Sequence, residues 1–239
     1  FDAIPITQNY ILQLHKILYS HINNPMAGKT KNVQNYISAT YPDGRTETLF
    51  TPPPPFETPE ALDAICNEYN RVIGNNELEP LIAIPVWIHD FLCIHPFNDG
   101  NGRMSRLLTT LLLYRSGFCV GKYISLEAKI AKNKDLYYDT LRASQNGWHE
   151  GKEDIAPFLK YLLGTILAAY KDFEDRFSLV ETKHPALETV RLATQQKIGR
   201  FSKQDIRELC PALSLSSLEG ALRKMVANGE LRREGNGKN

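Results

Sequence analysis

The segment that most constrains the fold is residues 80–94, PLIAIPVWIHDFLCI, which is almost entirely apolar. Such a run must be buried. It favours a core helix that bends or begins near Pro85, where proline removes a backbone donor. Residues 102–116 show a second helical pattern, which Gly117 is expected to end. A polar, glycine-rich stretch joins the two, and we expect a mainly helical body around this pair.

The rest of the body shows further helical patterns and one hairpin. Apolar spacing predicts four more helices, over residues 8–23, 57–74, 126–146 and 153–177. Thr58 is expected to be an N-cap. Two β-prone runs around Pro42-Asp43-Gly44 predict a hairpin over about residues 33–50. The proline-rich stretch 51–59 is then expected to be a stiff, extended spacer.

The charge balance changes sign near residue 183. Residues 183–239 hold 11 basic and 6 acidic side chains, whereas residues 1–182 hold 17 and 21, which indicates two modules. The second module shows the order helix, helix, turn, helix, strand, with Ser202 and Asp205 at capping-box spacing. That order is typical of a winged helix. We therefore expect a body over residues 1–177 and a winged-helix domain over 183–239, incomplete at its C-terminal end.

Cysteine usage and hydropathy limit the cellular setting. The four cysteines form neither a CxxC pair nor a zinc spacing, so we expect reduced thiols in a cytoplasmic protein: Cys66, Cys93, Cys119 and Cys210. The apolar run after Arg106 is too short to span a bilayer, and no secretory signal is visible, so no membrane contact is expected. The net charge of +1 predicts no partner by itself.

The stretch IHPFNDGNGRMSRLL, residues 94–108, places two arginines at the start of a helix. That end of a helix already carries partial positive charge, so Arg103 and Arg106 are unfavourable there unless an anion offsets them. One turn apart, they would bracket a polyphosphate. The first N–H groups of the helix are expected to form an anion-binding concavity together with Gly100, Asn101 and Gly102.

Neighbouring residues supply the remaining chemistry. Asp99 is a hard oxygen donor suited to Mg²⁺ shared with phosphate oxygens. His95, with an ordinary pKa of about 6.5, is a workable general base. Phe97 would anchor the loop in the core, and Asn101 occupies a position that tolerates left-handed backbone. The set matches transfer of a phosphorus-centred group to a hydroxyl. The Walker pattern and the kinase signatures are absent from the sequence.

These residues resemble the signature of a known family. The motif HxFx[D/E]GNGRxxR of the Fic (Fido) family is matched position for position by His95, Phe97, Asp99, Gly100, Asn101, Gly102, Arg103 and Arg106. The similarity covers about residues 1–177. The hairpin resembles the family's flap, and residues 132–148 are similar to its helix on the nucleotide side. The winged helix resembles an appendage of some members.

The resemblance implies a protein adenylyltransferase, which moves AMP from ATP to a Ser, Thr or Tyr hydroxyl of a protein. It implies His95 as the general base and Asp99 as the Mg²⁺ ligand. The nucleotide would be held by Gly100, Asn101, Gly102, Arg103 and Arg106, with Tyr138 and Gln145 near the base or ribose. The flap is expected to dock the protein substrate by strand pairing, and the chain itself is a further candidate substrate for auto-adenylylation.

Alternatives remain open at this point. One is transfer of another phosphorus-centred group, phosphoryl or a different nucleotidyl unit. The other is a nucleotide-sensing, DNA-binding regulator that acts through the winged helix, whose candidate surface includes Ser217, Arg223 and Lys224. Protein contact or a homodimer through that domain is equally compatible with the sequence.

The family's inhibitory helix, [S/T]xxxE[G/N], is matched by none of the Glu-Gly pairs in the sequence. The chain is therefore either unrestrained or inhibited by a segment upstream of Phe1. We expect the second, because the chain does not begin with methionine.

Overall fold

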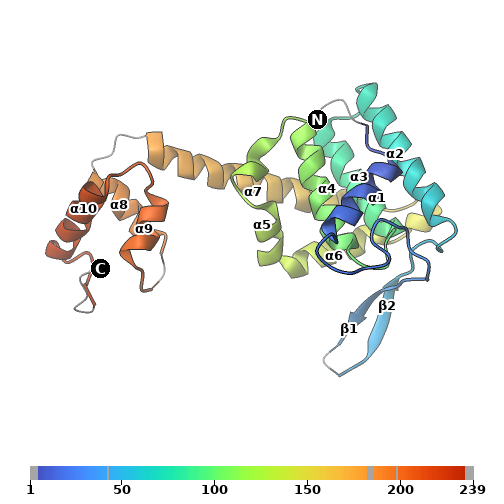
Figure 1. Cartoon of the computed structure of the whole chain (residues 1–239), viewed down its shortest axis with the longest axis horizontal. Coiled ribbons are helices and arrows are strands. Elements are labelled where there is room, and N and C mark those ends of the chain that lie inside the picture. The colour runs from blue at the N-terminus through green and yellow to red at the C-terminus, as the bar shows by residue number, and fades with distance from the viewer. Residues whose placement is uncertain (1–4, 42, 182–185, 198, 235–239) are drawn as a thin grey trace. The chain divides into compact units, whose positions relative to one another are not determined.

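The structure is a computed structural model that describes residues 5–41, 43–181, 186–197 and 199–234. The chain forms two compact units, Phe1–Tyr170 and Lys171–Asn239, and the boundary falls within the long helix α7, Ala156–Glu181 (Figure 1). Helices dominate both units, and the strands found among the described residues form a single hairpin. The expected mainly helical class with one hairpin is therefore confirmed.

The apolar segment forms the core of unit 1. It folds as α3 (Pro80–Ile94), which packs against both α2 (Thr58–Gly74) and α4 (Asn101–Arg115). Its side chains are buried around the helix, and Ile84, Ile88 and Phe91 are almost completely inaccessible. The helix begins at Pro80, where a missing N–H costs no intrahelical bond, and continues through Pro85. Of the two alternatives expected for Pro85, a helix start there is therefore wrong, and a bend there stays a prediction.

Three other boundaries differ from the sequence-based expectation. The first helix, α1 (Gln8–Leu18), ends five residues before residue 23. The expected helix 126–146 is two helices, α5 (Leu126–Lys132) and α6 (Lys134–Gln145), separated at Asn133, whose ψ of 43° is not helical. Thr58 is the first residue of α2 rather than its N-cap, and its hydroxyl donates to the carbonyl of Pro54 at 2.9 Å.

The hairpin consists of β1 (Ile37–Thr40) and β2 (Thr46–Phe50), paired antiparallel. A register irregularity lies between Ile37 and Ser38, which adds local twist to the ribbon. Both strands lie within the expected range 33–50. A two-stranded ribbon has an unpaired edge on each side, and Figure 1 shows it extending from the helical body of unit 1. The hairpin is therefore a suitable surface for an added strand.

Unit 2 contains α8 (Ala186–Gln195), α9 (Lys203–Leu209) and α10 (Leu215–Ala227). They pack around a small core formed by Val190, Ala193, Ile206, Cys210, Leu218, Ala221 and Met225. The predicted capping box at the start of α9 is present, with Asp205 accepting from the Ser202 backbone N–H at 2.7 Å. Residues 230–234 form no strand, and residues 235–239 lie outside the described residues. The three helices agree with the expected order, while the wing stays a prediction.

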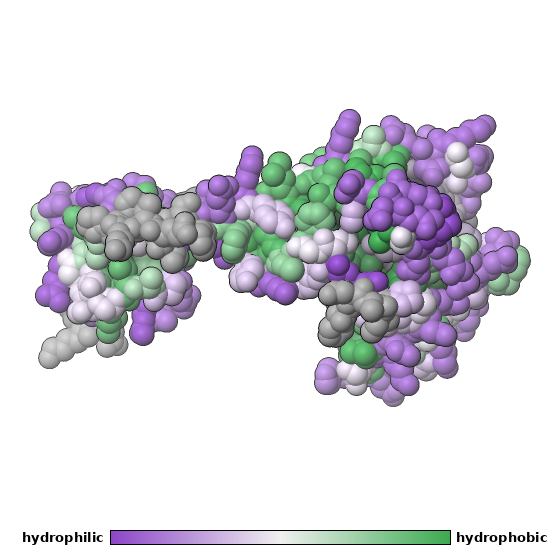
Figure 2. Space-filling view, turned by 90° about the horizontal axis from the view of Figure 1, so that it is seen from above, coloured by the Kyte–Doolittle hydropathy of each residue, from purple (hydrophilic) through white to green (hydrophobic). Residues whose placement is uncertain are grey.

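The surface of the molecule is mixed. Figure 2 shows hydrophobic side chains gathered over the middle of the helical body of unit 1, with hydrophilic side chains around them. Tyr123 and Leu167 are among the large apolar residues that are more than half exposed in this unit. Within the part of the chain that the structure describes, no helix combines the length and the apolar content needed to cross a membrane.

The remaining elements of unit 1 are two short 3₁₀ turns, Cys119–Lys122 and Trp148–Glu150. The second follows α6 and lies next to the hairpin, because the His149 imidazole donates from Nε2 to the carbonyl of Thr51 at 2.9 Å. Its ring also stacks on Phe50, with the centroids 5.2 Å apart. The base of the hairpin is therefore attached to the end of α6.

Candidate active site

The loop between α3 and α4 is shaped by two left-handed residues. His95 ends α3 with φ 51°, and Gly100 precedes α4 with φ 89°. Asn101 does not adopt the left-handed conformation that we expected near it. It is the first residue of α4, and its side-chain amide accepts from the Phe97 N–H at 2.9 Å and donates to the Phe97 carbonyl at 2.7 Å. Phe97, the expected anchor, is fully buried.

The loop leaves the start of α4 open to an anion. The first N–H groups of a helix have no intrahelical partner, and Gly100 has no side chain with which to cap them. Arg103 and Arg106 extend from the first two turns of the same helix end. Uncapped N–H groups and cations, the two structural elements of a phosphate site, therefore occur together at this helix end.

His95 is held in one tautomer. Its Nδ1–H donates to the Leu92 carbonyl at 3.2 Å, so Nε2 carries the lone pair in the neutral ring. Burial lowers the pKa of His95 to about 4, and the positive charge of Lys31 acts in the same direction, whereas the Leu92 carbonyl opposes them. The imidazole is therefore a neutral proton acceptor at physiological pH.

We expect the His95 imidazole to titrate near pH 4, far below its ordinary value of about 6.5. NMR of the imidazole carbons over a pH series measures this midpoint. Because the unfolded chain binds a proton at higher pH than the folded chain, the stabilising contribution is complete above pH 6.5 and is lost as the pH falls toward 4. A midpoint near 6.5 in the folded protein would contradict this assignment.

Asp99 lies at the centre of a small polar network with α1. Its Oδ2 accepts from the Tyr19 hydroxyl at 2.5 Å and from Arg103 Nη2 at 2.9 Å, and Arg103 also donates to the Tyr19 oxygen. Its Oδ1 accepts from the Gly100 N–H at 2.7 Å. The bond from Tyr19 contributes most to holding the pKa of Asp99 below its usual range. Asp99 is thus a preoriented, ionised carboxylate.

Both arginines have carboxylate partners in this structure. Arg103 pairs with Asp99, and the Arg106 Nε donates to Glu127 of α5 at 2.9 Å. Glu127 is two-thirds exposed, so this ion pair contributes little energy and can give way to a phosphate. The expectation of a cationic pair facing an anion site is compatible with this geometry, but the two carboxylate partners were not foreseen.

Helix α1 supplies residues that sequence reasoning missed. The Gly28 N–H donates to His15 Nδ1 at 2.9 Å, so His15 Nε2 carries the proton and donates to the Asp99 carbonyl at 3.1 Å. The His15 ring stacks on Phe97, with the ring centroids 3.7 Å apart. His15 and Tyr19 are separated from Asp99 by 84 and 80 residues, and no local pattern links them.

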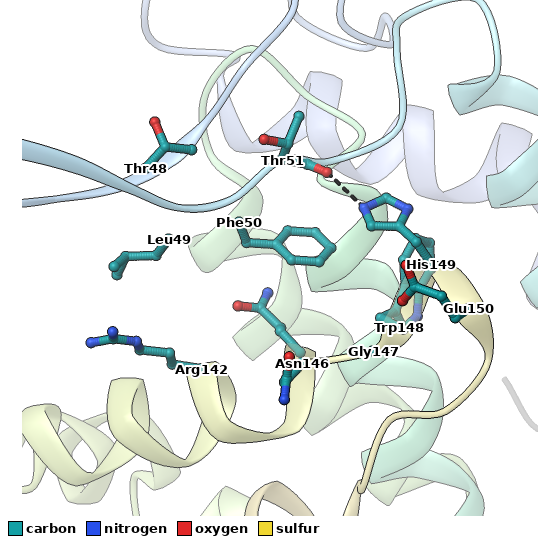
Figure 3. A pocket seen from close by; sticks show the side chains of 11 residues that line it. Thr48, Leu49, Phe50, Thr51, Arg142, Asn146, Gly147, Trp148, His149 and Glu150 are labelled. Carbon is teal, nitrogen blue, oxygen red and sulfur yellow. Dashed lines mark hydrogen bonds between the residues drawn. The ribbon is translucent and has the colours of Figure 1, made fainter.

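A second feature is a pocket of about 460 Å³ beneath the hairpin, between β2 and the end of α6. Figure 3 shows Leu49 and Phe50 of β2 facing Arg142 and Asn146 across it. Gln145 also lines this pocket. It is 5% exposed, and its Nε2 has no nitrogen or oxygen hydrogen-bond partner among the described residues. Its side chain does interact with the buried Cys93 thiol, but sulfur is a weak acceptor, so a ligand oxygen or nitrogen would satisfy this buried donor better.

Tyr138, the other residue assigned to the nucleotide side, lies on α6 and is half exposed. It is not among the residues that line the pocket. The structure therefore brings Gln145 to the pocket, while Tyr138 remains a prediction on the same helix.

Fold and site together define a helical domain with a glycine-rich turn between its two core helices, a histidine before that turn and two arginines after it. The sequence model of the Fic/DOC family matches residues 5–113. These residues therefore form a Fic domain, and the family expected from the motif is confirmed.

Two curated relatives and one solved structure illustrate the similarity. The chain is 29% identical over 140 residues to a Fido domain-containing protein of Dictyostelium discoideum, covering 56% of this chain and 92% of that protein. It is 28% identical over 218 residues to the protein adenylyltransferase Fic of Drosophila yakuba, covering 87% of this chain but 38% of that protein. The chain thus spans less than half of the length of that adenylyltransferase.

The solved structure is a Fic domain containing signalling protein from Bacteroides thetaiotaomicron. It aligns with a TM-score of 0.54 at 24% identity, covering 71% of this chain and 64% of that one. This likeness shows a shared fold.

Proposed function

We propose that this chain is a protein adenylyltransferase, which transfers AMP from ATP to a Ser, Thr or Tyr hydroxyl of a protein. The observation that carries the proposal is the neutral His95, with the lone pair on Nε2, at the start of the loop that leads to the uncapped N-terminus of α4. The Fic adenylyltransferases among the curated relatives supply the choice of AMP as the transferred group. Residues 1–177 would carry this activity.

In the proposed reaction the target hydroxyl attacks the α-phosphorus of ATP and pyrophosphate leaves. Nε2 of His95 accepts the hydroxyl proton as the new oxygen–phosphorus bond forms. The open N–H groups at the start of α4 and the guanidinium groups of Arg103 and Arg106 bind the negatively charged phosphates. Each arginine then exchanges a side-chain carboxylate for a phosphate.

Asp99 fits a role as the protein ligand of Mg²⁺. The carboxylate is ionised and mostly exposed, and its Oδ1 accepts one hydrogen bond, so a lone pair remains for a cation. No cluster of three or more metal-binding side chains occurs among the described residues. A magnesium ion held by one carboxylate and by substrate phosphates agrees with this donor set. When bound, it would neutralise charge on the phosphates.

The pocket beneath the hairpin is the proposed place for the base or ribose. It is lined by Gln145, whose buried amide nitrogen can donate to a base or sugar oxygen or to a ring nitrogen. The open edge of the hairpin is the proposed docking surface for the protein substrate. A cytoplasmic location belongs to the same proposal, supported by the four free cysteines.

A labelling experiment tests the proposal. The chain is incubated with Mg²⁺, a cell lysate and ATP labelled at either the α- or the γ-phosphorus. We expect label from the α-position, on the chain or on a lysate protein, and none from the γ-position. Transfer of the γ-label would show that the activity is phosphoryl transfer and not adenylylation. Transfer of neither label would contradict the proposal. α-Labelled GTP and CTP test the choice of base.

A further inference from the structure

Four consecutive backbone carbonyls, those of residues 94–97, accept hydrogen bonds from Lys31 and Asn35. Lys31 Nζ donates to the Ile94 carbonyl at 3.0 Å, and the Lys31 N–H donates to the Pro96 carbonyl at 2.8 Å. Asn35 Nδ2 donates to the carbonyls of His95 and Phe97 at 3.2 and 3.0 Å. Lys31 and Asn35 lie in the segment between α1 and β1, and we refer to them together as the carbonyl clamp.

These carbonyls need partners because of where they lie. The last carbonyls of a helix lack intrahelical donors, and α3 ends at Ile94. The next residue, His95, has φ 51° and ψ 61°, which is unfavourable for a residue with a β-carbon. Such a conformation persists only where surrounding contacts determine it. The carbonyl clamp supplies those contacts on both sides of His95.

Lys31 also brings a positive charge to the end of α3, next to His95. Its side chain is 2% exposed, and its ammonium contacts two uncharged oxygens, those of Ile94 and Asn35. No carboxylate is paired with it among the described residues. Burial lowers the pKa of Lys31 to about 8, which still leaves the amine protonated near neutral pH. The positive charge therefore acts on His95 without a neutralising partner.

We infer that Lys31 and Asn35 are positioning residues of the active site. They hold the His95 backbone in its left-handed conformation, and the Lys31 ammonium places a positive charge beside the imidazole. Neither residue lines the pocket beneath the hairpin, and both act through the His95 loop. The catalytic meaning of this inference rests on the proposed function, whereas its effect on the imidazole does not.

The test uses three variants of the whole chain. Lys31→Met removes the charge and the amine but retains an unbranched side chain of similar length. Asn35→Ala removes the two hydrogen bonds from Nδ2 to the carbonyls and the Oδ1 acceptor of Lys31, and it leaves the charge of Lys31. Lys29→Met is the matched control, because Lys29 is an exposed lysine two residues away. Each variant is measured for kcat and KM of α-label transfer, for the NMR titration of His95, and for thermal unfolding.

We expect both clamp variants to lower kcat by about tenfold to a hundredfold, because misplacing a catalytic group by about 1 Å has effects of that size. The KM for ATP should change by less than about threefold, since the phosphate contacts remain. Lys31→Met should also raise the His95 midpoint above pH 4, whereas Asn35→Ala and Lys29→Met should leave it unchanged. Lys31→Arg, which keeps the charge, should restore the midpoint.

The inference is overturned if kcat stays within about threefold of the wild type in both clamp variants while the His95 midpoint is unchanged in Lys31→Met. If Lys31→Met does not fold, the kcat of Asn35→Ala decides whether the carbonyl clamp positions His95. Should the wild-type chain transfer no label, the proposed function fails. Even then, the titration of nucleotide-free Lys31→Met shows whether Lys31 lowers the pKa of His95.

Discussion

Replacing His95 with asparagine should lower AMP transfer by about 10²- to 10⁴-fold, the usual contribution of a general base. Asparagine tolerates the left-handed backbone of this position, and its amide can still donate to the Leu92 carbonyl. Asparagine lacks a basic lone pair that could accept the proton of the target hydroxyl. Single-turnover transfer of the α-label from saturating ATP measures the loss, which should fall on kcat.

His95→Ala serves as the comparison. It removes the base and also places a residue poorly suited to φ 51° at the end of α3, so it should cost a further 1–2 kcal/mol or so of stability. ATP binding, measured by calorimetry, should persist in both variants. The proposed phosphate contacts are made by the start of α4, Arg103 and Arg106, which follow the loop that His95 begins. Wild-type rates in His95→Asn would show that another group accepts the proton.

The contiguous part of the site could be predicted from the sequence. Asp99, Gly100 and the two arginines lie within eight residues, and the chemistry of a helix N-terminus links them without any tertiary information. The sequence indicates a sharp turn among Gly100, Asn101 and Gly102 without deciding which of them is left-handed. Asn101 tolerates such a conformation, but its amide is engaged by the Phe97 backbone, and Gly100 makes the turn instead.

The contacts made across the fold could not be predicted. Tyr19 and Lys31 reach the loop from at least 60 residues away, in segments whose local pattern indicates only a helix and a connection to a hairpin. Glu127 likewise meets Arg106, because the connection between α4 and α5 brings the start of α5 back to the start of α4. A break at Asn133 then separates α5 from α6. Apolar spacing continues through that break, which explains why a single helix was expected there.

Gly100→Ala is expected to disrupt the loop more than any other single methyl group. At φ 89° a β-carbon is strained, and here it would lie 2.8 Å from the Tyr19 hydroxyl and 3.1 Å from its ring. That hydroxyl cannot move away without breaking its bond to Asp99. We expect a loss of about 2–5 kcal/mol in stability, from backbone strain plus overpacking. AMP transfer should fall by about 10²-fold, because Asp99 and the start of α4 are displaced.

Gly117→Ala is the matched control for this prediction. Gly117 ends the same helix with φ 85°, but a β-carbon there meets nothing within 4 Å. Backbone strain alone should therefore lower the stability of Gly117→Ala, by about 1–2 kcal/mol, and this variant should keep its activity. Chemical denaturation gives the free energy of unfolding of both variants. The difference between their losses is the cost of the clash with Tyr19, because both variants carry the same kind of backbone strain. Adding Tyr19→Phe to Gly100→Ala should recover part of the stability as a favourable coupling, since the clashing oxygen is gone. Equal losses in the two glycine variants would mean that contact between α1 and the loop contributes nothing to its shape.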